Sequence, residues 1–266
     1  MSLALDLARA ASPAVLADAI GMEPDAWQDD VLSSDDARIL LNCHRQSGKS
    51  TTAAVLGVHG TVYRARSLAL IFSPSMRQSR EVLQTCVTLY RSLGRPVLAE
   101  AENALSLILE NGSRIISLPG SEATVRGYAG VDLVIIDEAS RVKDELVAAV
   151  RPMLAVSGGR LIGMSTPRGR RGWWWDAWEN GGAVWKRVRV PACRVRPNGT
   201  LESLTPRISA AFLEEERHAL GERLFAQEYM CEFVETTDQA FGVDAVKAAF
   251  SRDLEPLRFD PSGSVS

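Results

Sequence analysis

The segment from Cys43 to Ser50 has the residues of a phosphate-binding loop. It follows a short apolar run, residues 37–42, and precedes residues 51–63, which have the pattern of a helix. At such a strand–loop–helix junction, successive backbone N–H groups converge on phosphate oxygens at the helix N-terminus. We expect Lys49 to reach the β- and γ-phosphates of a nucleotide and the Ser50 hydroxyl to ligate Mg²⁺.

The rest of the loop is expected to contact the same nucleotide. Gly48 lets the backbone pass close to the phosphates, and Gln46, Ser47 and Thr51 lie beside it in the sequence. The usual pattern is GxxxxGK[ST], and here Cys43 stands in place of the first glycine. A Gly-Lys-Ser tripeptide also occurs in ordinary strand-to-helix turns. The prediction therefore depends on the flanking strand and helix.

Two acidic residues end another buried run. Four apolar residues, 133–136, place Asp137 at the carboxyl end of a strand, and Glu138 follows it. We expect Asp137 to hold Mg²⁺ through water, and Glu138 to orient and polarise an attacking water. A strand that ends in solvated acids is the plain alternative for this pair alone. Together with the phosphate loop, the pair indicates hydrolysis of a nucleoside triphosphate.

Hydroxyl groups and arginines near these motifs are further candidates. Ser165 and Thr166 end the next predicted strand and can sense a γ-phosphate through hydrogen bonds, although a capped turn before Pro167 would have the same residues. Arg45 lies inside the loop and would act in cis. Arg141 would act from a neighbouring subunit, or would be a solvated helix residue. An arginine that stabilises transition-state charge raises the rate by orders of magnitude.

Gln28, directly after Trp27, is a candidate reader of adenine. A carboxamide can accept from the N6 amino group of adenine and donate to N7, as it does in DNA recognition. The alternative is a glutamine on the exposed face of a helix.

Alternating strands and helices predict an α/β fold with a parallel central sheet flanked by helices. Asn111-Gly112 between two apolar runs indicates a β-hairpin. We expect helices at 3–20, 25–32, 51–63, 76–93 and 208–232, strands at 37–42, 67–72, 132–137, 160–165 and 184–190, and the hairpin at 105–109 and 113–117.

The composition excludes several classes of protein. The chain has 266 residues and a net charge of −3, so it has no strongly basic overall field, and nucleic acid would have to bind through local patches. Its 4 cysteines form no CxxC pair, which suggests neither a zinc site nor a disulfide framework. We expect no signal peptide and no membrane span.

Local basic density is the remaining sequence signal. Arginines and lysines gather between residues 160 and 196, with interleaved tryptophans from Trp173 to Trp185. Such a face could bind the phosphate backbone of a nucleic acid without sequence specificity. The alternative is a solvated face, and for the tryptophans we favour the core of a small subdomain.

These motifs in this order resemble the ATPase domain of the large terminase subunit of tailed bacteriophages. The resemblance runs over residues 24–242 and includes the adenine motif, the arginine-bearing phosphate loop, the acidic strand and the Ser-Thr-Pro coupling motif. Further matching stretches are Phe72–Ser75 with Gln78, Arg126–Tyr128, Arg168-Gly169, Glu228-Tyr229, Cys231–Phe233 and Phe241-Gly242.

The resemblance implies an additional-strand, RecA-like P-loop fold with a lid subdomain, ATP and Mg²⁺ as cofactors, and Glu138 as the catalytic base. It also implies a homo-oligomeric ring around double-stranded DNA in the bacterial host cytoplasm, with a portal protein and a small terminase subunit as partners. We therefore expect an N-terminal helical segment (1–23), an ATPase core (24–174), a lid and linker (175–242) and a tail (243–266).

One departure from the family pattern concerns the nuclease domain that usually follows. No metal-binding constellation of acids comes after residue 242, so we do not expect DNA cleavage by this chain, which would be a fragment, a split gene product or a truncated remnant. Two other functions stay open: a helicase-like or restriction-type DNA translocase, and an ATP-binding assembly module with little turnover.

Overall fold

The computed structural model describes residues 3–120, 127–235 and 249. Its main element is a sheet of eight strands: β1 Arg38–Cys43, β2 Leu68–Ser73, β3 Ala99–Glu102, β4 Ser106–Leu109, β5 Arg114–Pro119, β6 Leu133–Asp137, β7 Arg160–Ser165 and β8 Lys186–Val190. The strand order is β3-β4-β5-β2-β6-β7-β1-β8. Across the sheet, each neighbouring pair from β5 through β2, β6, β7 and β1 to β8 is parallel. The β3–β4 and β4–β5 pairs are antiparallel. The predicted α/β class with a mostly parallel sheet is confirmed.

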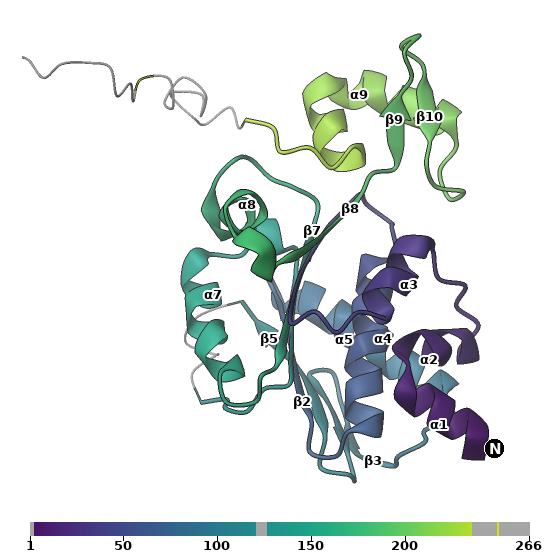
Figure 1. Ribbon diagram of the computed structural model, residues 1–266, viewed down its shortest axis with the longest axis vertical. Helices are drawn as coiled ribbons and strands as arrows, with labels where there is room; N and C mark the ends of the chain where they lie inside the picture. The colour runs from purple at the N-terminus through teal and green to yellow at the C-terminus, as the bar shows by residue number, and fades with distance from the viewer. Residues whose placement is uncertain (1–2, 121–126, 236–248, 250–266) are drawn as a thin grey trace, which may run out of the picture. The chain divides into compact units, whose positions relative to one another are not determined.

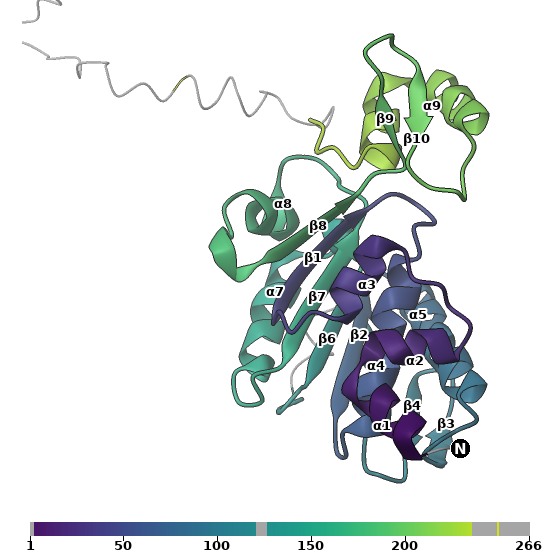
Figure 2. The same cartoon turned by 45° about the vertical axis from the view of Figure 1, so that its right-hand side comes forward.

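Helices cover both faces of this sheet (Figures 1 and 2). One face packs against α2 Pro13–Ala19, α3 Ala26–Leu32, α4 Lys49–Tyr63 and α5 Met76–Ser92, with α1 Leu3–Ala11 beside α2. The other face packs against α7 Asp144–Val150, α8 Gly172–Glu179 and the short helices η1 Ala139–Arg141 and η2 Arg151–Leu154. The central strands are buried on both sides, and this explains why they are continuous apolar runs in the sequence.

Two predicted helical segments are interrupted. Residues 3–20 form two helices, because Ser12 caps α2 and Pro13 occupies its first turn, where a missing N–H costs nothing. Helix α9, Ala210–Tyr229, has a non-helical residue at Gly221, with φ 73° and ψ 159°. A side chain other than glycine would be strained there, so the glycine permits the bend.

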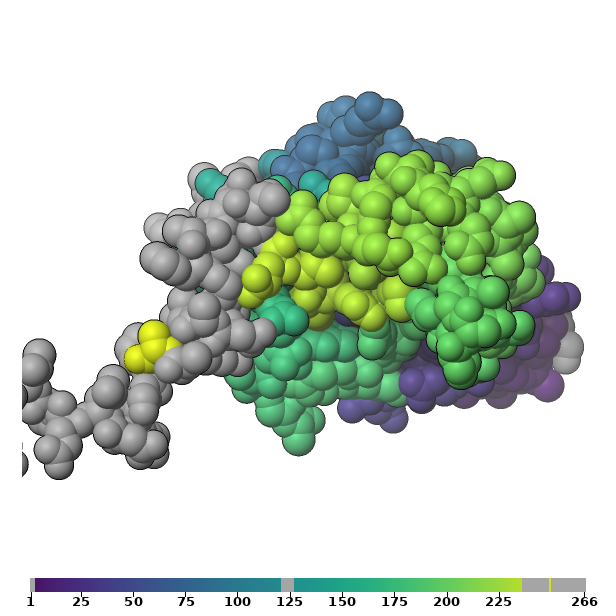
Figure 3. Space-filling view, turned by 90° about the horizontal axis from the view of Figure 1, so that it is seen from above, coloured from purple at the N-terminus to yellow at the C-terminus, as the bar shows by residue number. Residues whose placement is uncertain are grey.

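A small unit follows the sheet. Strands β9 Cys193–Val195 and β10 Leu201–Ser203 pair in antiparallel fashion and pack with α9 around their own apolar cluster. Figure 3 looks down on this unit, which is coloured green to yellow-green. Strand β8 pairs with β1, so it belongs to the main sheet, although we expected these residues in the lid and linker. The boundaries of the N-terminal segment (1–23), the core (24–174), the lid and linker (175–242) and the tail (243–266) stay a prediction.

The tryptophans do not form the core of the small unit, and this expectation was wrong. Trp174 and Trp185 are buried in the cluster formed by α7, α8 and the sheet, whereas the described residues of the small unit's core include no tryptophan. Gly163 in β7 makes room for Trp174 and for the neighbouring Trp173, since a Cβ there would lie 2.8 Å from Trp174 Cζ3 and 3.1 Å from Trp173 Cη2. The aromatic helix α8 is therefore part of the body built around the main sheet.

Some expectations fall outside the described residues. These are Arg126, Phe241, Gly242 and nearly all of the tail 243–266. Among the described helices, none is long and apolar enough to cross a membrane.

Candidate nucleotide site

The phosphate loop connects β1 to α4. Gln46 and Gly48 both have positive φ, 61° and 90°, and Gly48 is the residue before the helix. This backbone turns the loop sharply and leaves the first N–H groups of α4 without partners inside the helix, as anion binding requires. Ser50 and Thr51 lie half-buried in the first turn, and the buried Ser47 Oγ has no hydrogen-bond partner.

Lys49 and Arg141 both approach the carboxylate of Glu138. The distances are 3.8 Å from Lys49 Nζ to Glu138 Oε1, and 3.7 Å from Arg141 Nε to Glu138 Oε2. Glu138 is itself in the left-handed region, with φ 49° and ψ 43°. A non-glycine residue is held there only when its surroundings impose it, and such strain is concentrated at functional sites. Three predicted catalytic residues therefore meet at the end of β6.

Asp137 ends β6 beside them. It is 8% exposed, and its Oδ1 has no hydrogen-bond partner among the described residues. Burial raises its pKa to about 6, although the nearby Lys49 opposes this shift. A desolvated carboxylate oxygen without a partner fits a cation, and Mg²⁺ is held by one or two carboxylates together with substrate phosphates. No cluster of three or more metal-ligating side chains occurs in the described ranges, so the phosphates would have to complete the ligand set.

Ser165 connects the coupling motif to the acidic loop. Its Oγ donates to Ser140 Oγ at 2.8 Å and accepts from the Ser140 N–H at 3.2 Å. Ser165 and Thr166 are both buried. Ser140 lies between Glu138 and Arg141 in η1, so the end of β7 is bonded to the turn that carries these two residues.

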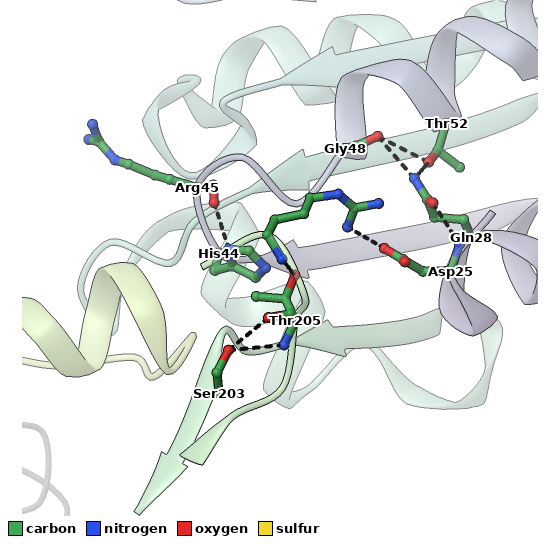
Figure 4. A network of polar contacts seen from close by, with 9 residues as sticks. Asp25, Gln28, His44, Arg45, Gly48, Thr52, Ser203 and Thr205 are labelled. Atoms are coloured by element: carbon green, nitrogen blue, oxygen red, sulfur yellow. Dashed lines mark hydrogen bonds and ion pairs between the residues drawn. The ribbon is translucent and has the colours of Figure 1, made fainter. Parts of the chain in front are cut away.

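Gln28 lies next to Gly48 and Thr52, where the phosphate loop leads into α4 (Figure 4). Its Nε2 donates to Thr52 Oγ1 at 2.9 Å and lies 3.5 Å from the Gly48 carbonyl, while its Oε1 accepts from the Asp25 N–H at 2.9 Å. The side chain is 1% exposed. Both ends of the carboxamide are thus engaged within the protein, and reading adenine would require these bonds to break.

Arg45 points away from Gly48 (Figure 4). Its Nε donates to Glu228 Oε2 of α9 at 2.6 Å, and this carboxylate raises the pKa of the guanidinium. The arginine side chain is 63% exposed. In this conformation the ion pair of Arg45 is with Glu228, and the charge of Glu138 adds to the same rise of its pKa.

Several basic residues between 160 and 196 are bonded to other parts of the protein, and a DNA-binding face formed by them stays a prediction. Arg187 donates to main-chain carbonyls around the end of α8, so its side chain satisfies the last carbonyl groups of this helix. Most of the others are paired with acids or carbonyls: Lys186 with Asp30 and Asp36, Arg160 with the carbonyls of Ser34 and Asp36, Arg194 and Arg196 with Glu202, and Arg189 with Glu232.

Sequence reasoning missed the partners that hold the site residues. Glu228 is 183 residues from Arg45, and Thr52 is 24 residues from Gln28. No local pattern signals such pairs, because the fold alone brings their chain segments together.

A parallel sheet of this order, with a phosphate loop after β1 and an acidic pair at the end of β6, defines a P-loop nucleoside triphosphatase. The chain belongs to the family described as terminase large subunit, T4likevirus-type, N-terminal, whose profile matches residues 41–248. It is thus of the DNA-packaging ATPase type.

Solved structures of large terminases have a similar fold. The ATPase domain of the Thermus phage P74-26 large terminase is 23% identical with a TM-score of 0.68, covering 82% of this chain and 97% of that chain. The HK97 bacteriophage large terminase is 17% identical with a TM-score of 0.65, covering 80% of this chain and 51% of that chain. A large terminase of the thermophilic bacteriophage D6E, solved in complex with ADP, is 11% identical with a TM-score of 0.57, covering 82% and 52% of the two chains. No curated protein sequence matches the chain.

Proposed function

We propose that this chain hydrolyses ATP and couples the hydrolysis to translocation of double-stranded DNA into a procapsid. The observation that carries the proposal is the position of Glu138 between Lys49 and Arg141, beside a phosphate loop. Phosphoryl transfer needs positioned charge more than covalent chemistry, and this arrangement supplies cations and a carboxylate at one point.

Each residue then has a role in hydrolysis. Lys49 and the N–H groups of the loop bind the β- and γ-phosphates, and Glu138 orients the attacking water. Ser50 and Asp137 would hold Mg²⁺, which when bound neutralises phosphate charge.

Arg45 would have to leave Glu228 to reach the phosphates. The exchange is feasible because the Arg45 side chain is 63% exposed, so water can solvate the guanidinium when it leaves the 13% exposed carboxylate of Glu228. Nucleotide binding at the loop would thereby break a contact with α9. This coupling fits a lid role for the unit of β9, β10 and α9. We extend this to Ser165 and Thr166, because the contact of Ser165 with Ser140 would relay hydrolysis to the rest of the chain.

The partners belong to the same proposal. We place the active form in a homo-oligomeric ring in the host cytoplasm, with a portal protein and a small terminase subunit. Arg141 is exposed enough to act on a neighbouring subunit, since 38% of its side chain is accessible.

The test measures phosphate release at a series of protein concentrations, with and without double-stranded DNA. We expect Mg²⁺-dependent release that rises more steeply than linearly with protein concentration and is stimulated by DNA. A rate proportional to concentration would exclude an arginine supplied by a neighbour. Nucleotide binding with no release under any condition would support an assembly module instead, a function favoured by the engagement of Arg45 with Glu228.

A further inference from the structure

Ser73, at the carboxyl end of β2, has a fully buried hydroxyl group. The residue is 0% exposed, and its Oγ forms no hydrogen bond with any residue that the structure describes. A buried hydroxyl without a partner costs stability, because the group loses its hydrogen bonds to water when the chain folds. Such a group calls for a ligand, an ion or an ordered water as its partner.

The residues around Ser73 in the same sequence motif have structural roles. Phe72 belongs to the apolar core on the side of α7 and α8. Ser75 caps α5, since its Oγ accepts from the Gln78 N–H at 3.3 Å. The Ser73 carbonyl accepts from the Gly120 N–H at 3.0 Å, and this bond fixes the backbone at the end of β2. Among these described groups, the hydroxyl of Ser73 is the one that no contact within the fold explains.

Ser73 lies beside Asp137, on the face of the sheet that α4 covers. The two residues directly follow the last register pair between β2 and β6. Side chains alternate between the two faces of a strand, and Ile71 and Ile135 both belong to the apolar cluster that includes α4. Two residues further along each strand, Ser73 and Asp137 therefore point to the same face, where Lys49 begins α4.

Both of the atoms without partners can accept hydrogen bonds. Asp137 Oδ1, like Ser73 Oγ, has no hydrogen bond within the described part of the chain. An ionised carboxylate only accepts hydrogen bonds, and a hydroxyl oxygen has two lone pairs that accept. A water bound to a cation can donate both of its hydrogens, because its lone pair faces the metal. Two neighbouring acceptors are therefore the partners that one such water needs.

From this arrangement we infer that Ser73 is a further positioning residue of the nucleotide site, and that it holds, together with Asp137, one water molecule of the Mg²⁺ shell. Mg²⁺ gives up its waters reluctantly, and it keeps several of them when it binds to carboxylates and phosphates. Outer partners of this kind orient the ligands of a metal and strengthen its binding. The inference rests on the proposed function, because it requires Mg²⁺ and a nucleotide at the loop.

The experiment compares Ser73→Ala with Ser117→Ala in the full chain. Ser117 pairs with Ile71 from the neighbouring strand β5, and its Oγ is also buried with no partner among the described residues. Each substitution removes a hydroxyl that costs stability. In buffer without metal and nucleotide, both variants should therefore unfold at the melting temperature of the wild type or above it.

Calorimetry then measures the binding of ATP with Mg²⁺ and with EDTA. The wild type should bind ATP more tightly with Mg²⁺ than with EDTA. Ser73→Ala should lose about tenfold of this gain, as expected for the loss of an outer partner, and should bind ATP in EDTA as the wild type does. Ser117→Ala should match the wild type in both buffers. Ser73→Cys keeps the size of the side chain but accepts weakly, so it should show the same loss and replaces the alanine variant if that variant does not fold.

An unchanged gain from Mg²⁺ in Ser73→Ala would overturn the inference. Together with a melting temperature lowered in this variant alone, it would identify a structural water at the hydroxyl instead. An equal loss of ATP affinity with Mg²⁺ and with EDTA would also overturn it, because the hydroxyl would then act on the loop and not on the metal. Failure of the wild type to bind ATP in either buffer would instead overturn the proposed function.

Discussion

Arg45 Nε lies 2.6 Å from Glu228 Oε2, so an arginine of the phosphate loop is paired with a glutamate of α9. In this conformation the guanidinium points away from Gly48 of the phosphate loop (Figure 4). On our proposal that Arg45 contacts the phosphates, nucleotide binding would draw this side chain away from Glu228.

Glu228→Gln should for this reason tighten ATP binding. Removing the charge of Glu228 frees Arg45, whose side chain is the exposed partner of the pair, and an ion pair worth about 1 kcal/mol corresponds to a gain of about fivefold. Equilibrium titration with ATP measures the effect. Glu202→Gln, which breaks the pairs with Arg194 and Arg196 away from the loop, is the control and should change nothing. Weaker ATP binding in Glu228→Gln would show that the pair supports the site.

Glu138→Gln should retain ATP binding while turnover falls by about 10²–10⁴-fold, the range expected for loss of a general base. The amide keeps the size of the side chain but cannot polarise water as a carboxylate does. Single-turnover hydrolysis and ATP titration separate the two effects. Glu145→Gln, at an exposed acid of α7, is the matched control. Full turnover in Glu138→Gln would remove this residue from the mechanism.

Asp137 should make the metal-free protein less stable as the pH rises. Its folded pKa is raised from 3.8 to about 6, so between these values the folded state binds more protons than the unfolded state, and stability falls with increasing pH. The penalty is absent below the unfolded pKa and complete above about pH 6, where it reaches up to about 3 kcal/mol.

Denaturant unfolding of the wild type and Asp137→Asn across pH 4 to 8 isolates this contribution, because the other carboxyl groups are common to both proteins. The stability of the variant relative to the wild type should increase up to about pH 6 and then stay constant. A difference that does not vary with pH would mean that the carboxyl titrates in its ordinary range.

The parts of the fold that could be predicted from the sequence are those determined by a pattern of consecutive residues. Strands such as β6 and β7 are buried on both faces, so they appear as unbroken apolar runs, and the Asn111-Gly112 turn fixes its hairpin locally. Lys49 and Glu138 could be found for the same reason, since each ends or follows a recognisable strand.

The rest depends on which distant segments the fold brings together. The direction of the Arg45 side chain is set by α9, and the bonds of Gln28 are set by α4. The tryptophans of α8 were misplaced because their partner, Gly163, is a small residue in another element, and a space left by a glycine has no signal in the local pattern.

Gly163→Ala should accordingly destabilise the protein. The new Cβ would lie 2.8 Å from Trp174 Cζ3, and the rigid buried ring cannot move without disturbing its neighbours, so overpacking should cost about 1–3 kcal/mol. Thermal unfolding measures the loss. Gly60→Ala, in the interior of α4 with ordinary space around it, is the control and should stabilise by about 0.5–1 kcal/mol. Equal stability of Gly163→Ala and the wild type would show that α8 adapts easily.

Ser165→Ala tests whether the contact with Ser140 has a role beyond stability. The substitution removes the acceptor of the Ser140 N–H and releases the turn that carries Glu138 and Arg141. We expect kcat to fall about ten- to a hundredfold through misplaced groups, with little change in ATP affinity.

The matched control is Ser113→Ala, at the opposite edge of the sheet. Ser113 is also fully buried, and its Oγ also bridges two backbone groups, the Ser67 N–H and the Arg64 carbonyl. Both substitutions remove a buried hydroxyl, so both should lower the melting temperature by similar amounts. Only Ser165→Ala should lower kcat, because only Ser165 is bonded to the catalytic turn. If the two variants differed from the wild type in stability alone, Ser165 would be a structural residue and the route from hydrolysis to movement would have to start elsewhere.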